Sequence, residues 1–375
     1  MIRLLPNLGG EEGPGWRDLR NEPPVRAQAR LWALLFPADV ECLYHEEPPA
    51  WPASLGGPPA EGAWPWLGSD GVVPWIVTDD AVSDPRVAGR PIAGPAPAVV
   101  RAVHDKAFAH AVAREEGLVP PVLRGCIDVL DPDALRAGDA ADAIDARLAA
   151  WPEWARARFT LKPRIGSSGR GRVAGADGRI DRAALGGALA RLAERGGALL
   201  EPWLERRADF SVQLHVAGDG VTVLGSLEQE VAPSGVFLGH RGEIDSRGRI
   251  FSGHPAEESL REAAALVAVA ARERGYAGPC GVDAFTFRDP ETGADALRPV
   301  VELNARFTAG TVTAGLVRRA LPHVKRALGL GPGERLRFRF RLRDPEEAGP
   351  GDGGFRVAFE PPGGASLVFG RGLDS

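Results

Sequence analysis

The sequence predicts an α+β protein with a small α/β domain at the amino terminus and a larger α+β region after it. Two patterns support this class. Residues 159–204 read in order as strand, glycine-rich turn, strand, helix and strand, which is an α+β order. Residues 335–343 alternate arginine with apolar side chains, and this period of two indicates a strand. At 375 residues and 44% apolar content, the chain is expected to divide into two or three domains.

Residues 1–100 are expected to form the small α/β domain, with long and irregular connections. Strand-like runs occur at residues 40–44 and 72–77. The region also holds six of the nine tryptophans. Its turns carry no Gly-x-Gly-x-x-Gly pattern, so a dinucleotide site of that kind is not supported.

Residues 101–330 are expected to form the second domain, and residues 331–375 a β-rich extension. A first helix is predicted at 107–116, where Gly117 and Pro120 are stop signals. The remaining predicted helices lie at 133–150, 181–195, 256–274 and 311–328, and further strands at 210–227, 281–285 and 299–304.

The composition argues against several classes of protein. A formal net charge of −5 gives no reason to expect a nucleic-acid or membrane-surface partner. The amino-terminal apolar stretch is too short for a signal peptide, and no later run has the length of a membrane span. Cys42, Cys126 and Cys280 lack the spacing of a zinc site or disulfide framework, which favours buried thiols in a reducing compartment. We therefore expect a cytoplasmic protein.

Lysine is rare in this chain. Among 45 lysine and arginine residues, only Lys106, Lys162 and Lys325 are lysines. A lysine retained among so many arginines suggests that a compact ammonium is needed at that position. Lys106 opens a helix-like run and Lys162 ends an apolar strand, so both are candidates to contact phosphate oxygens. Compositional bias is the alternative explanation.

A glycine-rich turn, Lys-Pro-Arg-Ile-Gly-Ser-Ser-Gly-Arg-Gly, occupies residues 162–171. Gly166 and Gly169 allow the backbone to approach a ligand closely, and consecutive N–H groups can surround an anion. The hydroxyls of Ser167 and Ser168 add donors. The turn is a candidate phosphate-binding loop, and an ordinary hairpin is the alternative.

Oxygen-bearing side chains lie on two predicted strands late in the second domain. Alternation places Glu302 and Asn304 on one face and Leu303 on the other, and Asp283 can join them from a neighbouring strand. Such ligands suit Mg²⁺, which takes one or two carboxylates and adds phosphate oxygens and water. A solvated strand face is the alternative, but the apolar neighbours indicate burial, and a buried acidic pair needs compensation.

A third element is the run Glu201-Pro202-Trp203-Leu204 at a predicted strand exit. An apolar clamp at such a place can hold a purine through main-chain groups, and Asp209 can accept hydrogen bonds from ribose hydroxyls. A crossover between domains is the alternative.

Taken in chain order, these elements resemble the ATP-grasp superfamily over about residues 99–330. The resemblance is carried by Asp105-Lys106, by residues 162–171 and 201–204, and by Val301-Glu302-Leu303-Asn304-Ala305-Arg306. It implies that two α+β subdomains clamp ATP, with a lid subdomain at about residues 158–204. Phosphate contacts are implied for Lys106, Lys162 and the loop of Gly166, Ser167, Ser168 and Gly169. Adenine-hinge contacts are implied for Glu201, Trp203 and Leu204, and a ribose contact for Asp209.

The resemblance also implies a metal site and a reaction. Asp283, Glu302 and Asn304 would bind Mg²⁺, with Glu302 bridging two ions and with Mn²⁺ able to substitute. Lys162 and Arg306 would be catalytic residues. The implied activity is that of an ADP-forming carboxylate-amine ligase. A small-molecule carboxylate forms an acyl phosphate, and an amine or another nucleophile displaces the phosphate. A homodimer is compatible with this class.

The chain departs from the family pattern in three places. Gly281 stands where the D-alanine ligase branch has an arginine, so Arg306 would have to supply that charge. Asp209 replaces a more usual glutamate. The amino-terminal region does not show the glycine-rich turn typical of many members, which leaves the substrate pocket unassigned.

Two other functions stay open on the sequence. A small-molecule kinase would use the same fold and stop at phosphorylation, and a non-catalytic ATP switch would act through a partner surface on the tryptophan-rich region. Candidates for the acceptor site are Glu228, Glu230, His240 and Arg241. His240 would lie in a polar loop, either as a base or as a solvated histidine. The arginines from Arg335 to Arg343 would form a solvated or salt-bridged strand face, or would cap an anionic substrate or a partner. The sequence names neither the carboxylate nor the nucleophile.

Overall fold

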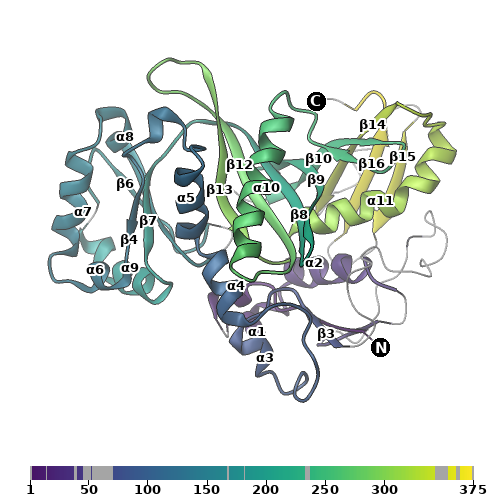
Figure 1. Ribbon diagram of the computed structural model, residues 1–375, viewed down its shortest axis with the longest axis horizontal. Helices are drawn as coiled ribbons and strands as arrows, with labels where there is room; N and C mark the ends of the chain where they lie inside the picture. Colours follow the sequence, from purple (N-terminus) through teal and green to yellow (C-terminus); the bar gives the residue numbers. More distant parts are fainter. Residues whose placement is uncertain are drawn as a thin grey trace.

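The computed structural model is an α+β protein built on three β-sheets (Figure 1). The first strands form a three-stranded sheet, which lies at the bottom of Figure 1. A four-stranded sheet lies at the left, and a nine-stranded sheet fills the centre and the upper right. The structure describes residues 2–13, 15–37, 40–44, 52, 71–166, 169–180, 182–232, 237–342, 354–359 and 364–373.

The amino-terminal sheet is parallel. Strand β1 (Ile2–Leu5) lies between β2 (Glu41–Cys42) and β3 (Gly71–Pro74). Parallel neighbours require a crossover, which α2 (Pro23–Ala33) provides between β1 and β2. Strands β2 and β3 confirm the two predicted runs. Strand β1 was not predicted, because four residues are too few to show a period. Within the described residues, the other helices of this region are η1 (Gly10–Glu12), α1 (Trp16–Leu19), α3 (Asp79–Val82) and α4 (Pro97–His104).

Aromatic side chains join this region to the large sheet. The ring of Trp32 is fully buried and meets Trp75 and Phe307 edge to face, with centroid distances of 5.5 and 5.2 Å. Trp16 is also buried. These three tryptophans are therefore core residues; Trp51, Trp64 and Trp66 lie outside the described residues.

The four-stranded sheet has the order β4-β7-β5-β6, and all of its pairings are antiparallel. Its helices pack on it around a hydrophobic core of its own. The prediction of a single helix at 133–150 was wrong, because the chain forms two helices there, separated around Gly138 and Asp139. The elements are β4 (Asp128–Leu130), α6 (Pro132–Arg136), α7 (Ala140–Ala149), α8 (Glu153–Ala157), β5 (Arg158–Pro163), β6 (Val173–Ala176), α9 (Arg182–Glu194) and β7 (Ala198–Pro202). We call the part from β5 to β7 the lid.

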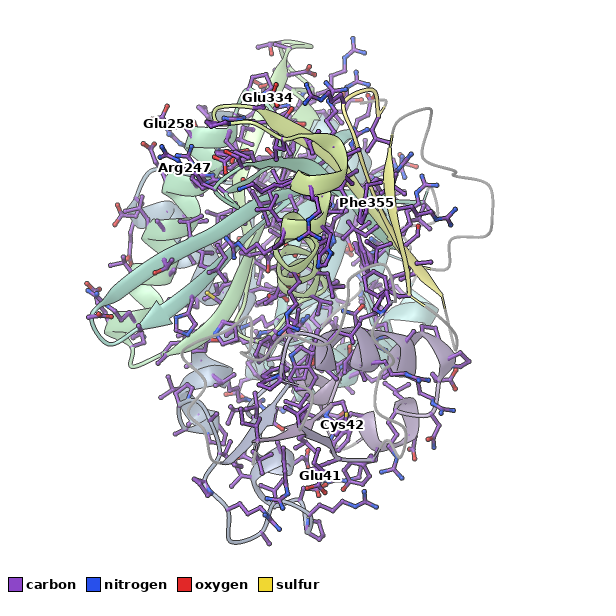
Figure 2. The ribbon with its side chains drawn as sticks, turned by 90° about the vertical axis from the view of Figure 1, so that its right-hand side faces the viewer. Glu41, Cys42, Arg247, Glu258, Glu334 and Phe355 are labelled. Carbon is purple, nitrogen blue, oxygen red and sulfur yellow. The ribbon has the colours of Figure 1, made fainter. Side chains whose placement is uncertain are left out.

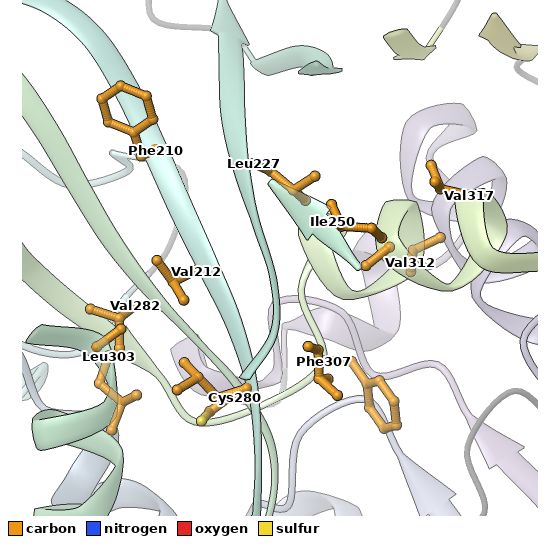
Figure 3. Packing of buried hydrophobic residues seen from close by; sticks show 14 of the residues in the cluster. Phe210, Val212, Leu227, Ile250, Cys280, Val282, Leu303, Phe307, Val312 and Val317 are labelled. Atoms are coloured by element: carbon orange, nitrogen blue, oxygen red, sulfur yellow. The ribbon is translucent and has the colours of Figure 1, made fainter. Parts of the chain in front are cut away.

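The nine-stranded sheet has the order β13-β12-β8-β9-β10-β14-β16-β15, with β11 beside β10. Helices α10 (Glu257–Glu273) and α11 (Ala309–Leu328) pack on it, and Figure 3 shows Val212, Val282 and Leu303 of the sheet core near one another. Its strands are β8 (Arg206–Ala217), β9 (Gly220–Val231), β10 (Phe237–Asp245), β11 (Ile250–Phe251), β12 (Gly278–Arg288), β13 (Asp295–Asn304), β14 (Arg335–Leu342), β15 (Phe355–Phe359) and β16 (Ala365–Gly370).

Strand β14 confirms the strand predicted from the arginine alternation. Phe338 and Phe340 are buried, whereas Arg335, Arg339 and Arg341 form ion pairs with glutamates of β9 and β10. The salt-bridged reading of this face is therefore confirmed for these arginines, and Arg343 lies outside the described residues. The β-rich extension continues the large sheet. The domain boundaries near residues 100 and 330 stay a prediction.

In the described part of the chain, no helix is both long enough and apolar enough to cross a membrane.

Candidate functional site

Lys106 lies where the lid meets the large sheet, at the start of α5 (Lys106–Glu115). The carboxylate of Asp105 caps this helix and accepts hydrogen bonds of 2.6 to 3.0 Å from Arg164, which directly follows β5. This pairing fixes the helix start against the lid. As a result, Lys106 Nζ donates to the Gly166 carbonyl oxygen at 2.8 Å and lies 3.0 Å from Glu302 Oε2.

Lys162 belongs to a buried group of three charges. Its ammonium pairs with Glu201, whose carboxylate also accepts a hydrogen bond of 3.0 Å from Arg298. Burial lowers the pKa of Lys162, although Glu201 opposes that shift. Burial acts to raise the pKa of Glu201, but Arg298 and Lys162 outweigh it and hold the pKa well below its ordinary value. Two cations thus share one carboxylate, and the positive excess suits an anionic ligand.

Asp283 and Glu302 form an acidic pair on neighbouring strands, opposite each other in register. Burial and the charge of Glu302 raise the pKa of Asp283. Burial acts in the same direction on Glu302, but Lys106 lowers its pKa below the ordinary value. Ser211 donates to Asp283 at 2.7 Å and orients it. Glu302 therefore holds the negative charge, and Asp283 is the carboxyl that a nearby cation would help to ionise.

The acidic pair fits a divalent cation, because such an ion would remove the repulsion that raises the pKa of Asp283. Among the described residues, no group of three or more His, Cys, Asp or Glu could hold a metal, so ligand oxygens would have to complete the shell. Asn304 Nδ2 donates to Asp283 at 3.1 Å, and Asn304 Oδ1 accepts from Arg306 at 3.0 Å. The amide of Asn304 must turn over before it can present oxygen to a cation.

Arg306 is held by the amino-terminal region. Its Nε lies 3.4 Å from Oε1 of Glu11, whose side chain is only 2% exposed. Glu11 belongs to the turn after β1, where Gly9 adopts a φ of 82°. The sequence reasoning did not predict this turn. The signal in the sequence was Gly9-Gly10 after a short apolar run, and it was missed together with β1.

Glu12, from the same turn, contacts the lid. Its two carboxylate oxygens accept hydrogen bonds from Arg170 at 3.0 Å and from Arg195 at 3.1 Å. Arg170 lies in the glycine-rich turn and Arg195 follows α9. One carboxylate of the amino-terminal region therefore bridges two separate segments of the lid.

The predicted hinge is divided between buried and exposed groups. Trp203 is 36% exposed, and the guanidinium of Arg172 lies 4.3 Å from its ring centroid. Leu204 is buried in the core, and the Glu201 side chain is engaged by Lys162 and Arg298. The Trp203 ring is thus the hinge side chain left for a base, while the Trp203 backbone N–H already donates to the Arg158 carbonyl oxygen at 2.7 Å. Asp209 accepts a hydrogen bond of 2.6 Å from Arg206.

Gly166 and Gly169 both have positive φ values, 153° and 68°, and the turn needs glycine at the second of these in particular. Ser167 and Ser168, between them, lie outside the described residues. Residues that the sequence reasoning missed near the site are Glu11, Glu12, Ser211, Gln229 and Arg298.

Among the acceptor-site candidates, the predicted placement of His240 was wrong. His240 lies in strand β10 and not in a polar loop, is 2% exposed, and its Nδ1 is 2.9 Å from Thr313 Oγ1. Burial lowers its pKa to about 3, so it is a neutral core residue. Glu228 pairs with Arg241 at 2.5 Å, and Glu230 pairs with two arginines of β14.

Solved structures resemble this arrangement, although no family model and no curated protein matches the sequence. The biotin carboxylase domain of Hydrogenobacter thermophilus 2-oxoglutarate carboxylase, solved with MgADP, ADP and bicarbonate, has a TM-score of 0.52 and 16% identity. The match covers 99% of this chain and 86% of that one. The chain has the ATP-grasp fold.

Two further solved structures are similar to this chain. Pyruvate carboxylase from Rhizobium etli has a TM-score of 0.50 and 15% identity, over 99% of this chain and 36% of that one. A protein described as a member of the ATP-grasp superfamily, from Archaeoglobus fulgidus, has a TM-score of 0.41 and 17% identity, over 82% of this chain and 77% of its own. At these identities the likeness concerns the ATP-grasp fold alone.

Proposed function

We propose that this protein is an ATP-dependent ligase that activates a small-molecule carboxylate as an acyl phosphate, which an amine or another nucleophile then attacks. ADP and phosphate are released. The observation that carries the proposal is the position of Lys106 Nζ, between the Gly166 carbonyl of the lid and Glu302 of the acidic pair. A phosphate chain held between the lid and the acidic pair would meet this ammonium. Bicarbonate and MgADP in the Hydrogenobacter structure support the same class of chemistry.

ATP would bind between the lid and the large sheet. Lys106 and Lys162 are the proposed phosphate contacts, together with the turn containing Gly166, Ser167, Ser168 and Gly169. The positive excess around Glu201 supports this role for Lys162. Trp203 and the main chain of Glu201 and Leu204 would hold adenine. Asp209 would reach the ribose only by giving up its hydrogen bond with Arg206 in favour of a ribose hydroxyl.

Asp283 and Glu302 would hold Mg²⁺, and Asn304 would join them after its amide turns. When bound, Mg²⁺ neutralises charge on the transferred phosphoryl group. Two ions, and Mn²⁺ as a substitute, belong to the proposal. Arg306, fixed by Glu11, would hold the carboxylate or stabilise the oxyanion of its derivative.

Water must be kept from an acyl phosphate, which requires a closed lid. The ion pairs of Glu12 with Arg170 and Arg195 hold the lid against the amino-terminal region. These contacts would delay opening while the acyl phosphate is present.

A hydroxylamine trap tests the proposal. Purified protein, Mg·ATP, hydroxylamine and pools of amino and hydroxy acids are incubated, and hydroxamate and ADP are measured. Hydroxamate that forms with one pool and is lost in Glu302→Gln would establish carboxylate activation. Glu258→Gln is a matched control, because Glu258 is exposed and takes part in none of the site contacts described above; it is labelled near the upper end of Figure 2.

Other outcomes identify other functions. ADP without hydroxamate would indicate a kinase. Binding of Mg·ATP without either product would favour a switch, but Trp16, Trp32 and Trp75 are core residues and do not form a partner surface. A homodimer and a cytoplasmic location stay predictions.

A further inference from the structure

A second cavity, of about 610 Å³, lies in the amino-terminal region. It shares none of its described lining residues with the candidate ATP site. Two of its residues, Glu41 and Cys42, lie at the lower end of the molecule in Figure 2, opposite the end that carries Glu334. The cavity lies beside β1 and β2 and has the volume of a small-molecule site. Its charged lining residues are Arg3, Arg20, Arg86, Arg90 and Glu41.

Tyr44 forms one wall of this cavity in a conformation that is rare for a non-glycine residue. Its φ is 69°, in the left-handed region. Its hydroxyl donates to the buried carboxylate of Asp84, whose oxygens lie 2.6 and 2.7 Å away. The ring also meets Trp16 edge to face, with a centroid distance of 5.9 Å. Such a backbone persists only where its surroundings hold it, and here they fix the ring at the cavity wall.

Two arginines stack on the ring of Tyr44. The guanidinium carbon of Arg86 lies 4.1 Å from the ring centroid, and that of Arg20 lies 4.5 Å away. Asp84 also accepts a hydrogen bond of 3.0 Å from the backbone N–H of Arg86, so one buried carboxylate positions both Tyr44 and Arg86. A guanidinium stacked by its face keeps its N–H groups free at the edge, where they can bind an oxyanion.

The charge in the cavity is not balanced. Arg3 pairs with Glu41 at 2.5 Å. Within the described residues, Arg20, Arg86 and Arg90 form no ion pair with a carboxylate. Two guanidiniums over the Tyr44 ring and a third that lines the same cavity therefore carry positive charge that an anionic ligand would compensate.

We propose that this cavity, which we call the Tyr44 pocket, binds a small polyanion with two or more phosphate or carboxylate groups. Arg20 and Arg86 bind its oxygens in a forked geometry, and Arg90 adds a third cation at the rim. The ring of Tyr44 holds the first two guanidiniums in place before the ligand arrives. This site is separate from the proposed ATP site and does not depend on the proposed ligase activity.

Isothermal titration calorimetry on the full chain tests the proposal, with inorganic pyrophosphate and citrate as probes and without ATP or Mg²⁺. We expect at least one probe to bind, and the tighter probe distinguishes phosphate from carboxylate recognition. The double variant Arg20→Gln/Arg86→Gln should weaken binding about tenfold or more, because charge-assisted hydrogen bonds are lost. The double variant Arg101→Gln/Arg124→Gln removes the same charge from exposed positions outside the cavity and should bind like the original protein.

Tyr44→Phe provides a second test that keeps every charge. Loss of the hydroxyl frees the ring from Asp84, so this variant should bind the probes more weakly. The melting temperature of the Arg20→Gln/Arg86→Gln variant is measured separately, to confirm that this variant is folded. The proposal is overturned if neither probe binds, or if both double variants bind the probes equally. Equal weakening in the two double variants would show that only overall charge matters.

Discussion

Replacing Glu12 with glutamine tests whether the amino-terminal region holds the lid closed. Glutamine keeps the size of the side chain and removes its charge, so both ion pairs to the lid are lost. Glu12 is 13% exposed, whereas Arg170 and Arg195 are 44% and 28% exposed. The contacts are thus partly screened by water, and their loss should loosen the lid without unfolding the protein.

The size of the effect follows from this exposure. Partly exposed ion pairs contribute about 0.2 to 1 kcal/mol each, so two pairs contribute about 0.4 to 2 kcal/mol. That range corresponds to about a 2- to 30-fold increase in the population of the open lid. Arg195 also donates to the Arg170 carbonyl oxygen at 3.3 Å, and this contact within the lid survives the substitution.

Limited trypsin digestion measures lid opening, because Arg170 lies on the glycine-rich turn and Arg172 directly follows it. When opening and closing are fast, the cleavage rate follows the open population. In the presence of a non-hydrolysable ATP analogue and Mg²⁺, Glu12→Gln should be cut about 2 to 30 times faster at this turn. Glu22→Gln, an exposed acid of the same region, is the matched control.

A double-mutant cycle makes the test specific. If the ion pair to Arg195 carries part of the effect, Arg195→Gln should loosen the lid much less in the Glu12→Gln background than in the original protein. Equal cleavage of the Glu12→Gln and Glu22→Gln proteins would refute the reasoning, and so would full additivity of the two substitutions.

Further predictions concern the buried charges. Glu201→Ala leaves Lys162 and Arg298 as buried cations without their carboxylate and should lower the free energy of unfolding by about 3 to 5 kcal/mol in urea denaturation, whereas a change near zero would contradict the buried triad. Glu302→Ala should abolish Mg·ATP-dependent turnover while circular dichroism shows an intact fold, and an active variant would exclude the metal assignment. Chelation of divalent ions should likewise stop turnover. Added Mg²⁺ or Mn²⁺ should restore turnover, which is measured as ADP release. Burial lowers the pKa of His240 from 6.5 to about 3, so below pH 6.5 the unfolded chain binds more protons than the folded one. The free energy of unfolding should therefore fall on acidification by up to about 1.4 kcal/mol per pH unit for this residue, and His240→Gln should reduce the slope.

Local patterns were enough to predict most of the large elements. The period of two in β14, the long helices α10 and α11, and the strands around Asp283 and Glu302 depend on side chains close together in the sequence, and each was confirmed. The juxtaposition of Glu302 and Asn304 also followed from strand alternation alone. These predictions succeed because burial on one face of a strand or helix imposes a period on the residues themselves.

Contacts between distant segments were decided only by the tertiary structure. Glu11 and Glu12 meet Arg306 and the lid across more than 150 positions of the chain, and no local pattern marks them. His240 illustrates the opposite error, because a histidine after a glycine has a loop-like sequence but sits in a central strand, where desolvation keeps it neutral. The sequence lists which charges exist, whereas burial and pairing in three dimensions determine which of them remain available to a ligand.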